Sequence, residues 1–227
     1  MNHGVPRAVL MVLLAFDAAL MVLHICWTLN LQGVQGFEAF ASPMFQLNRD
    51  HSFSEWVEYA KSGLTALALF VAWAWAGQPI YAGLAIVHLS MAADNALTIH
   101  ERLGRAIGPS IAPGGRFGVG EGHLGEILVF GGWGVLFATI VFFSWSVSMP
   151  EHRRVSRSLI FLAAGVGLFA VVLDALDVTP LVASLSKTAL ILLEDGGETL
   201  MPSLNCAVAA SVVFALHLRR LPLAGAR

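Results

Sequence analysis

Charged side chains are scarce in this sequence. Lysine, arginine, aspartate and glutamate make up 12% of the 227 residues, whereas hydrophobic residues make up 57%. A soluble domain usually carries about 25% charged residues, so the composition argues against a soluble enzyme. The net charge is -2 and no basic stripe is present, which gives no sign of a nucleic-acid partner. We therefore expect an all-α polytopic membrane helix bundle.

Cysteine is also rare, and the familiar catalytic motifs are missing. The two cysteines, Cys26 and Cys206, lie inside apolar runs, and no Cys-x-x-Cys motif is present. This excludes a zinc ribbon and a thioredoxin-type redox motif, so buried structural roles are the simplest interpretation. The sequence also has no Gly-x-Ser-x-Gly, no His-Glu-x-x-His and no phosphate-binding loop, so no known catalytic signature identifies a reaction.

Long apolar runs dominate the chain, and about 20 apolar residues suffice for one membrane-spanning helix. A single integral membrane domain over residues 1–227 with about six spans accounts for them. We predict these spans at about 6–29, 59–76, 80–100, 123–147, 158–176 and 198–218. The first run is longer than the apolar core of a signal peptide, so we expect it to be retained. The mixed segment 32–58 and the short apolar segment 178–193 are expected to lie at the membrane interface.

Basic residues near the short loops indicate the orientation of the spans. Arg153, Arg154 and Arg157 lie between the fourth and fifth predicted spans, and Arg219 and Arg220 follow the sixth. With six spans these residues all fall on one face. We therefore expect both termini in the cytoplasm and the protein in the inner (plasma) membrane of a bacterium.

Acidic side chains are distributed unevenly around the predicted spans. Parity places the ends of the third and fifth spans and the starts of the fourth and sixth on one side. All but two of the 15 acids, Asp17 and Glu151, fall on this outer half. Charged residues in a membrane are costly, so they usually face the interior of the bundle and have a partner. We expect the acids to gather around a common space on the outer side.

Helical spacing groups several of these acids with histidines. Asp94, Thr98 and Glu101 share one stripe of the predicted third span, at i, i+4 and i+7. Carboxylates together with imidazoles are typical ligands of Fe, Mn or Zn, and di-metal sites in helix bundles use inward glutamates and histidines. The candidate metal ligands are Asp94, His100, Glu101, His123, Glu126, Glu194 and Glu198.

Glycines and buried polar residues add further expectations. Gly196 and Gly197 lie between two of the acids and are predicted to break the helix there. The glycine-rich segment 104–122 is expected to form a flexible outer loop. A chain of Asp17, His24, His88 and Asp94 could carry protons or could form hydrogen bonds between helices.

Three short motifs resemble a set of uncharacterised bacterial multi-pass membrane proteins. They are Asn48-Arg49-Asp50 with Ser52-x-x-Glu55-Trp56 before the second span, Asp94 with Ile99-His100-Glu101 after the third, and Glu194-Asp195-x-x-Glu198 before the last. The resemblance covers most of the chain and implies no activity. In broad outline the chain is also similar to membrane hydrolases that hold zinc between helices, although their three-histidine site is not evident here.

Three functions are consistent with these observations. The leading hypothesis is a metal-binding membrane protein that could be an enzyme for a lipid or another apolar substrate, with a divalent ion (Fe, Mn or Zn) activating water or oxygen. The first alternative is a cation or proton transporter, which a continuous polar path below the acids would favour. The second is an accessory subunit of a larger membrane complex, or a homo-oligomer, which exposed apolar helix faces would favour.

Overall fold

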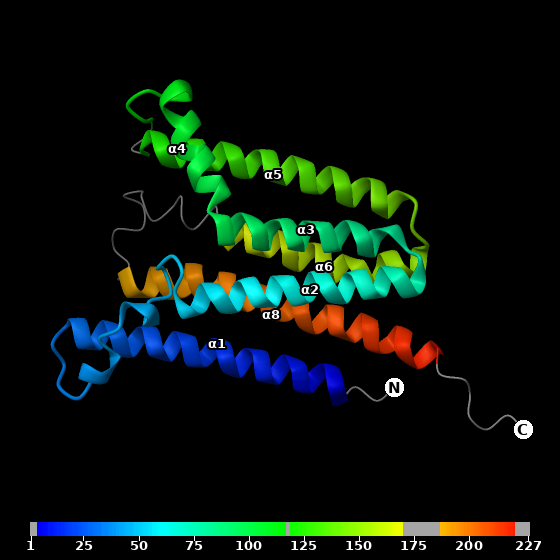
Figure 1. The fold of residues 1–227 in the computed structure, drawn as a ribbon, viewed down its shortest axis with the longest axis horizontal. Helices are drawn as coiled ribbons and strands as arrows, with labels where there is room; N and C mark the ends of the chain where they lie inside the picture. Colours follow the sequence, from blue (N-terminus) through cyan, green and yellow to red (C-terminus); the bar gives the residue numbers. More distant parts are fainter. Residues whose placement is uncertain (1–3, 117–118, 170–186, 221–227) are drawn as a thin grey trace, which may run out of the picture.

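The computed structural model describes residues 4–116, 119–169 and 187–220. These residues are almost entirely helical, as the composition predicts (Figure 1). The α-helices are α1 (Gly4–Leu31), α2 (Phe53–Ala76), α3 (Pro79–Leu97), α4 (Ile99–Ile111), α5 (Glu121–Ser146), α6 (Pro150–Gly167) and α8 (Lys187–Arg220). Two 3-10 helices, η1 (Glu38–Phe40) and η2 (Pro43–Phe45), lie between α1 and α2.

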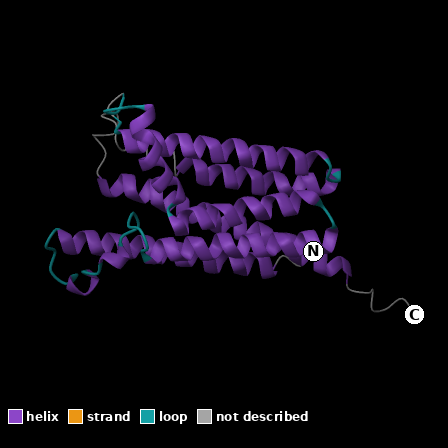
Figure 2. Cartoon of the chain, turned by 45° about the horizontal axis from the view of Figure 1, so that its top comes forward, coloured by secondary structure: helices purple, strands orange, loops and turns teal. Residues whose placement is uncertain are grey.

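The long helices form a bundle in which α1, α2, α3, α5, α6 and α8 run alongside one another (Figure 1). Figure 2 shows the same bundle turned. Helix α4 lies obliquely at one end, next to the last turns of α3 and the first turns of α5, and we call this the α4 end. The first turns of α8 also lie at this end (Figure 1).

The apolar core lies between α2, α3, α6 and α8. Its buried residues include Leu69 from α2, Leu84 from α3, Leu159 from α6 and Val212 from α8. In contrast, α1 and α5 expose many large apolar side chains, and Gly125 is the buried residue of α5. Exposing apolar surfaces of this extent to water is unfavourable, whereas the hydrocarbon core of a bilayer accommodates them.

Within the described residues, four helices are long and apolar enough to cross a membrane. They are α1, α3, α5 and the Thr188–Arg220 part of α8. The chain therefore has the character of a membrane protein. Helices α2 and α6 are less apolar, so the count of six spans stays a prediction.

The third helix ends earlier than the predicted span 80–100. Helix α3 stops at Leu97 because Thr98 adopts a left-handed conformation, with a φ of 49°. A new helix, α4, starts at Ile99. The predicted stripe of Asp94, Thr98 and Glu101 is therefore wrong, since a helical stripe cannot continue through this break. His100 and Glu101 belong to α4 instead.

The predicted outer loop 104–122 is wrong in its first part, because α4 continues to Ile111, whereas the described residues between Ile111 and the start of α5 at Glu121 are not helical. Glycines allow α4 to lie very close to α5. A Cβ added to Gly104 would come within 2.6 Å of the backbone nitrogen of Glu126, and one added to Gly125 within 2.0 Å of the carbonyl oxygen of Gly104. Gly104 of this segment and Gly125 of α5 therefore serve close helix packing, where the sequence suggested loop flexibility.

The predicted helix break at Gly196 and Gly197 does not occur, because α8 continues through both glycines and through Pro202. Gly197 instead accommodates a neighbour: a Cβ there would lie 2.3 Å from Cδ1 of Phe169. Helix α8 thus starts well before the predicted span 198–218 and includes residues 187–193 of the predicted interfacial segment. The other part of that segment, 178–186, lies outside the described residues.

Helix α6 and the segment before α2 also differ from or refine the predictions. Helix α6 begins at Pro150, before the predicted start of the span 158–176, because a proline favours the first position of a helix. Residues 170–176 of that span lie outside the described residues. The segment 32–58 contains η1, η2 and the first turns of α2, whose N-cap is Ser52.

Candidate functional site

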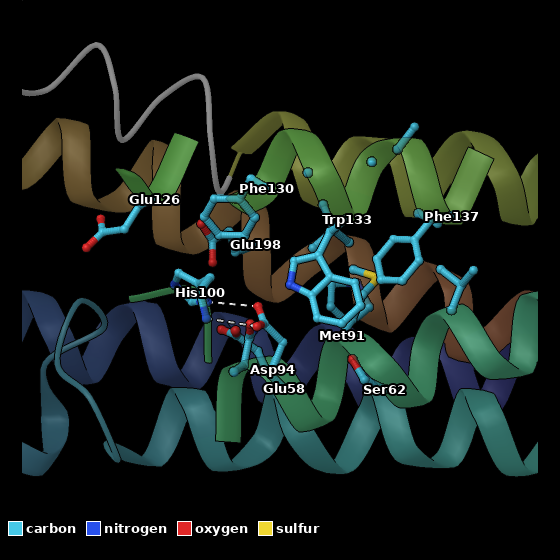
Figure 3. Close-up of a pocket in the computed structure, with 18 of the residues that line it drawn as sticks. Glu58, Ser62, Met91, Asp94, His100, Glu126, Phe130, Trp133, Phe137 and Glu198 are labelled. Carbon is cyan, nitrogen blue, oxygen red and sulfur yellow. Dashed lines mark hydrogen bonds and ion pairs between the residues drawn. The ribbon is translucent and has the colours of Figure 1, made fainter. Parts of the chain in front are cut away.

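A cavity of about 990 Å³ opens among the helices near the α4 end, and Figure 3 shows many of the side chains that line it. Helices α2, α3, α5, α6 and α8 contribute to its walls, and α4 contributes to its mouth. The side chains predicted from the sequence to form one site all line this cavity: Asp94, His100, Glu101, His123, Glu126, Glu194 and Glu198. The expected gathering of acids from different helices is therefore present.

The cavity has a polar part and an apolar part. Figure 3 shows Asp94, Glu58 and Glu198 near His100 in one part of the view, and Met91, Trp133 and Phe137 beside one another in another part. Further apolar side chains complete the second part: Leu84, Val87, Ile127, Val141 and Ile160. A molecule that occupied both parts would have to be amphipathic.

The centre of the polar part is a pair formed by Asp94 and His100. One carboxylate oxygen of Asp94 lies 2.8 Å from Nδ1 of His100, and the other accepts a hydrogen bond of 3.0 Å from the backbone N–H of His100. The break at Thr98 makes this possible, because it turns the chain so that α4 begins over the end of α3. Asp94 is 4% exposed. Its carboxylate caps the first turn of α4 through the backbone hydrogen bond and orients the imidazole through the side-chain hydrogen bond.

The surroundings of His100 favour its protonated form. Burial alone would lower the pKa of His100, but the hydrogen bond and the charge of Asp94 outweigh it. The nearby charges of Glu101 and Glu126 act in the same direction, so the pKa is raised above the ordinary value of 6.5. The ring also lies against Phe130, with 4.5 Å between the ring centroids. His100 is thus held in place on two sides.

Two further contacts between a carboxylate and a basic side chain lie at the mouth of the cavity. Glu101 lies 3.1 Å from Arg105 within α4, and Nδ1 of His123 lies 3.2 Å from Glu126 within α5. Arg105 and His123 are exposed to water in these contacts, which weakens both of them. Near them, the first turns of α2 add Glu55 and Glu58 to the cavity wall. The site is therefore rich in carboxylates.

The structure does not by itself assemble a metal centre. Among the described residues, no three or more side chains of His, Cys, Asp or Glu are arranged to hold a metal ion. Asp94, Glu101 and Glu126 each interact with a basic side chain instead. Metal binding by the seven predicted ligands therefore stays a prediction.

A buried polar network extends from the cavity into the bundle. Glu58, which is 8% exposed, accepts a hydrogen bond of 2.5 Å from the hydroxyl of Thr199. The carbonyl oxygen of Thr199 accepts one of 3.0 Å from Nζ of Lys61. Lys61 forms a buried ion pair with Asp17, and Ser203 donates a hydrogen bond of 2.6 Å to the other oxygen of that carboxylate. The network joins α1, α2 and α8.

The predicted chain of Asp17, His24, His88 and Asp94 does not form. Nδ1 of His24 accepts the backbone N–H of Leu47, at 3.2 Å. Nε2 of His88 has no hydrogen-bond partner among the residues that the structure describes. Asp17 instead contacts Lys61 of α2, because the side chain of Lys61 is long enough to reach the carboxylate from the neighbouring helix.

Sequence reasoning missed the contributions of α2 and of the aromatic side chains on α5. The signal for α2 was present: Ser54, Glu58, Lys61, Ser62 and Thr65 recur at helical spacing and are all buried. Phe130, Trp133 and Phe137 likewise recur at i, i+3 and i+7 and line the cavity. Such an aromatic stripe is also typical of a lipid-facing helix, so the sequence did not distinguish the two roles.

Comparison with known proteins gives the family of the chain. No curated protein and no solved structure matches it. Residues 8–213 match a family described as a domain of unknown function (DUF8692). This match covers most of the sequence, so the chain belongs to the DUF8692 family.

Proposed function

We propose that this protein binds an amphipathic molecule from the bilayer, a lipid or a comparable apolar substrate, and acts on its polar end. The observation that carries the proposal is the cavity itself, in which an apolar part lined by Met91, Trp133 and Phe137 adjoins the Asp94–His100 pair. Ligand sites typically combine an apolar lining with a few convergent polar groups. Six spans, with the α4 end outside the inner membrane, are part of this proposal.

The chemistry that this pair supports is general acid–base catalysis. Nδ1 of His100 interacts with the carboxylate of Asp94. Nε2 of the same ring is therefore the atom that accepts a proton from water or from a hydroxyl group. The raised pKa of His100 makes its neutral ring a stronger base, and the ring then returns the accepted proton to the leaving group. Hydrolysis or transfer at the polar end of a lipid needs both steps.

A divalent metal ion would add Lewis acidity to this site. Its candidate ligands, Glu126, Glu194 and Glu198, line the same cavity. Elemental analysis of the purified protein beside Glu198→Ala separates the two versions of the proposal. Near-stoichiometric Fe, Mn or Zn that falls in the variant supports a metal-dependent enzyme. A metal content near zero in both samples contradicts metal dependence.

Blocking the apolar part of the cavity tests the binding step. Gly134 lines the cavity, and Gly132, on the same helix, is not among the lining residues; an added Cβ meets nothing within 4 Å at either position. We expect Gly134→Leu to lose the lipid or apolar molecule that co-purifies with wild type in native mass spectrometry, whereas Gly132→Leu retains it. Equal occupancy of both variants would contradict the proposal.

A proton transporter is a second candidate, because a specific observation favours it. The network from Glu58 through Thr199 and Lys61 to Asp17 links the cavity to the middle of α1 by hydrogen bonds. Buried ionisable chains of this kind mark proton pathways in membrane proteins. Vesicles containing the protein would then dissipate a pH gradient, and Asp17→Asn would stop this. A gradient that persists with wild type contradicts the transporter.

A further inference from the structure

We infer that the cavity selects amphiphiles whose polar end is positively charged, such as an alkylammonium group. The inference rests on the proposed function and names its substrate class. Two independent features of the cavity lead to it, namely the charge of its polar part and the aromatic side chains that adjoin that part.

The polar part carries an excess of negative charge. Its wall includes Arg105 and two histidines, but each of these interacts with a carboxylate of its own. Two further carboxylates, Glu55 and Glu58, receive hydrogen bonds from the neutral hydroxyls of Tyr59 and Thr199. When these carboxylates are ionised, the hydroxyls do not neutralise their charge, and a cavity with low-dielectric walls concentrates its effect.

Glu58 is the carboxylate most relevant to a ligand. It is 8% exposed, and Figure 3 shows it close to Asp94, where the first turns of α2 lie beside the end of α3. A buried carboxylate is costly unless a partner compensates its charge. Burial raises the pKa of Glu58 to about 7, because the hydrogen bond from Thr199 and the charge of Lys61, which is paired with Asp17, offset the cost of burial only in part. A cationic group in the cavity would supply the missing compensation, whereas an anionic group would be repelled.

Aromatic rings adjoin this negative region. The ring of Phe130 contacts His100, and the rings of Trp133 and Phe137 stack, with 5.4 Å between their centroids. Aromatic faces attract ammonium groups, and most strongly where water is excluded. The same rings offer apolar surface to an alkyl chain. The stripe on α5 therefore suits a molecule with an ammonium group at one end and a chain behind it.

Three probes with the same chain length test this selectivity. They are decyltrimethylammonium, its uncharged carbon isostere with a tert-butyl end, and decyl sulfate. Binding is measured by titration calorimetry on wild-type protein in nanodiscs, and Gly134→Leu defines the part of the signal that belongs to the cavity. We expect the cation to bind about tenfold more tightly than the isostere, because one cation–aromatic contact and one carboxylate together supply that difference.

Variants assign this preference to the polar part. Glu58→Gln keeps the shape of the side chain and should reduce the preference several-fold, as should Phe130→Leu. Glu151→Gln is the matched control, because Glu151 is 64% exposed and does not line the cavity. Glu126→Gln, at the more accessible mouth, is the second carboxylate variant if Glu58→Gln does not fold.

The outcomes separate the inference from the proposed function. Equal affinity for the cation and the isostere, both sensitive to Gly134→Leu, overturns the inference and leaves the proposed function intact. Tightest binding of decyl sulfate also overturns the inference. Binding of all three probes that is insensitive to Gly134→Leu overturns the proposed function as well.

Discussion

At the scale of single residues, the site depends on a few polar contacts with definite geometry. The pair of Asp94 and His100 forms because a non-glycine residue, Thr98, takes a left-handed conformation between them. Such a conformation is costly for a side chain with a branched Cβ. The two hydrogen bonds from His100 to Asp94 offset this cost, so the break and the pair depend on each other.

The pair makes stability depend on pH. The folded pKa of His100 is raised above 6.5, so its stabilising contribution is complete below the unfolded pKa and is lost as the pH rises through the folded pKa. We expect the melting temperature of wild type to exceed that of His100→Asn by a few degrees at pH 6 and by less at pH 9. A difference that is constant over this range would contradict the assignment.

The acid–base role gives a second residue-scale prediction. Asp94→Asn keeps a hydrogen-bond acceptor near His100 but removes the charge that raises its pKa. We expect the pKa of His100 to fall in this variant, as followed by NMR titration of labelled histidine. Glu38→Gln is a suitable control, because Glu38 belongs to the short helix η1 and does not line the cavity. An unchanged titration of His100 would show that Asp94 does not control it.

At the scale of helices, small residues and buried charges decide which elements lie together. Helix α4 is held against α5 by the mutual approach of Gly104 and Gly125. Helix α1 is held by the contact of Asp17 with Lys61 and Ser203 in addition to apolar packing. The two contacts differ physically, since one requires the absence of a side chain and the other requires two opposite charges.

The α4–α5 contact predicts an effect of adding one methyl group. Gly104→Ala would bring its Cβ within 2.6 Å of the backbone of Glu126, and overpacking of this kind costs about 1–3 kcal/mol. We expect a lower melting temperature and a displaced α4. Gly120→Ala is the matched control, because a Cβ there meets nothing within 4 Å. Equal melting temperatures of the two variants would argue against the close contact.

The buried ion pair predicts non-additive mutations. Asp17→Leu or Lys61→Met alone leaves one buried charge without its partner, which costs about 3–5 kcal/mol. The double variant removes both charges, so we expect it to recover most of the lost stability in thermal unfolding. Effects that simply add would show that the two side chains do not interact. The contact would then not hold α1 in the bundle.

At the scale of the whole molecule, the bundle is asymmetric along its length. The carboxylates and histidines of the site and helix α4 lie at one end, and the turns from α2 to α3 and from α5 to α6 lie at the other (Figure 1). The basic residues Arg153 and Arg154 follow the second of these turns. This arrangement, with Arg153 and Arg154 at the end opposite to α4, agrees with an orientation in which the α4 end faces away from the cytoplasm.

Cysteine labelling checks this orientation. Ser110 is exposed on α4 and Glu151 is exposed at the opposite end. In a background with Cys26 and Cys206 replaced by serine, we expect Ser110→Cys to react with an impermeant maleimide on intact spheroplasts. Glu151→Cys should react after the membrane is permeabilised. Labelling of both sites on intact spheroplasts would contradict the predicted topology.

The sequence by itself determined the helical membrane character and the gathering of acids at one end. Backbone groups in a bilayer need internal hydrogen bonds, so long apolar runs have few alternatives to helices. The parity of successive helices then places the acids together, whichever way the protein faces. Both features depend on local composition and on the order of the helices, which a sequence shows directly.

Only the tertiary structure decided which side chains interact. The ion pair of Lys61 with Asp17, the hydrogen bond of Glu58 with Thr199 and the contact of Phe130 with His100 join different helices. Their formation depends on helix rotation and distance, and neither follows from the spacing along one helix. The end of α3 also depends on tertiary contacts. The hydrogen bonds between His100 and Asp94 stabilise the break at Thr98, which precedes His100 in the sequence.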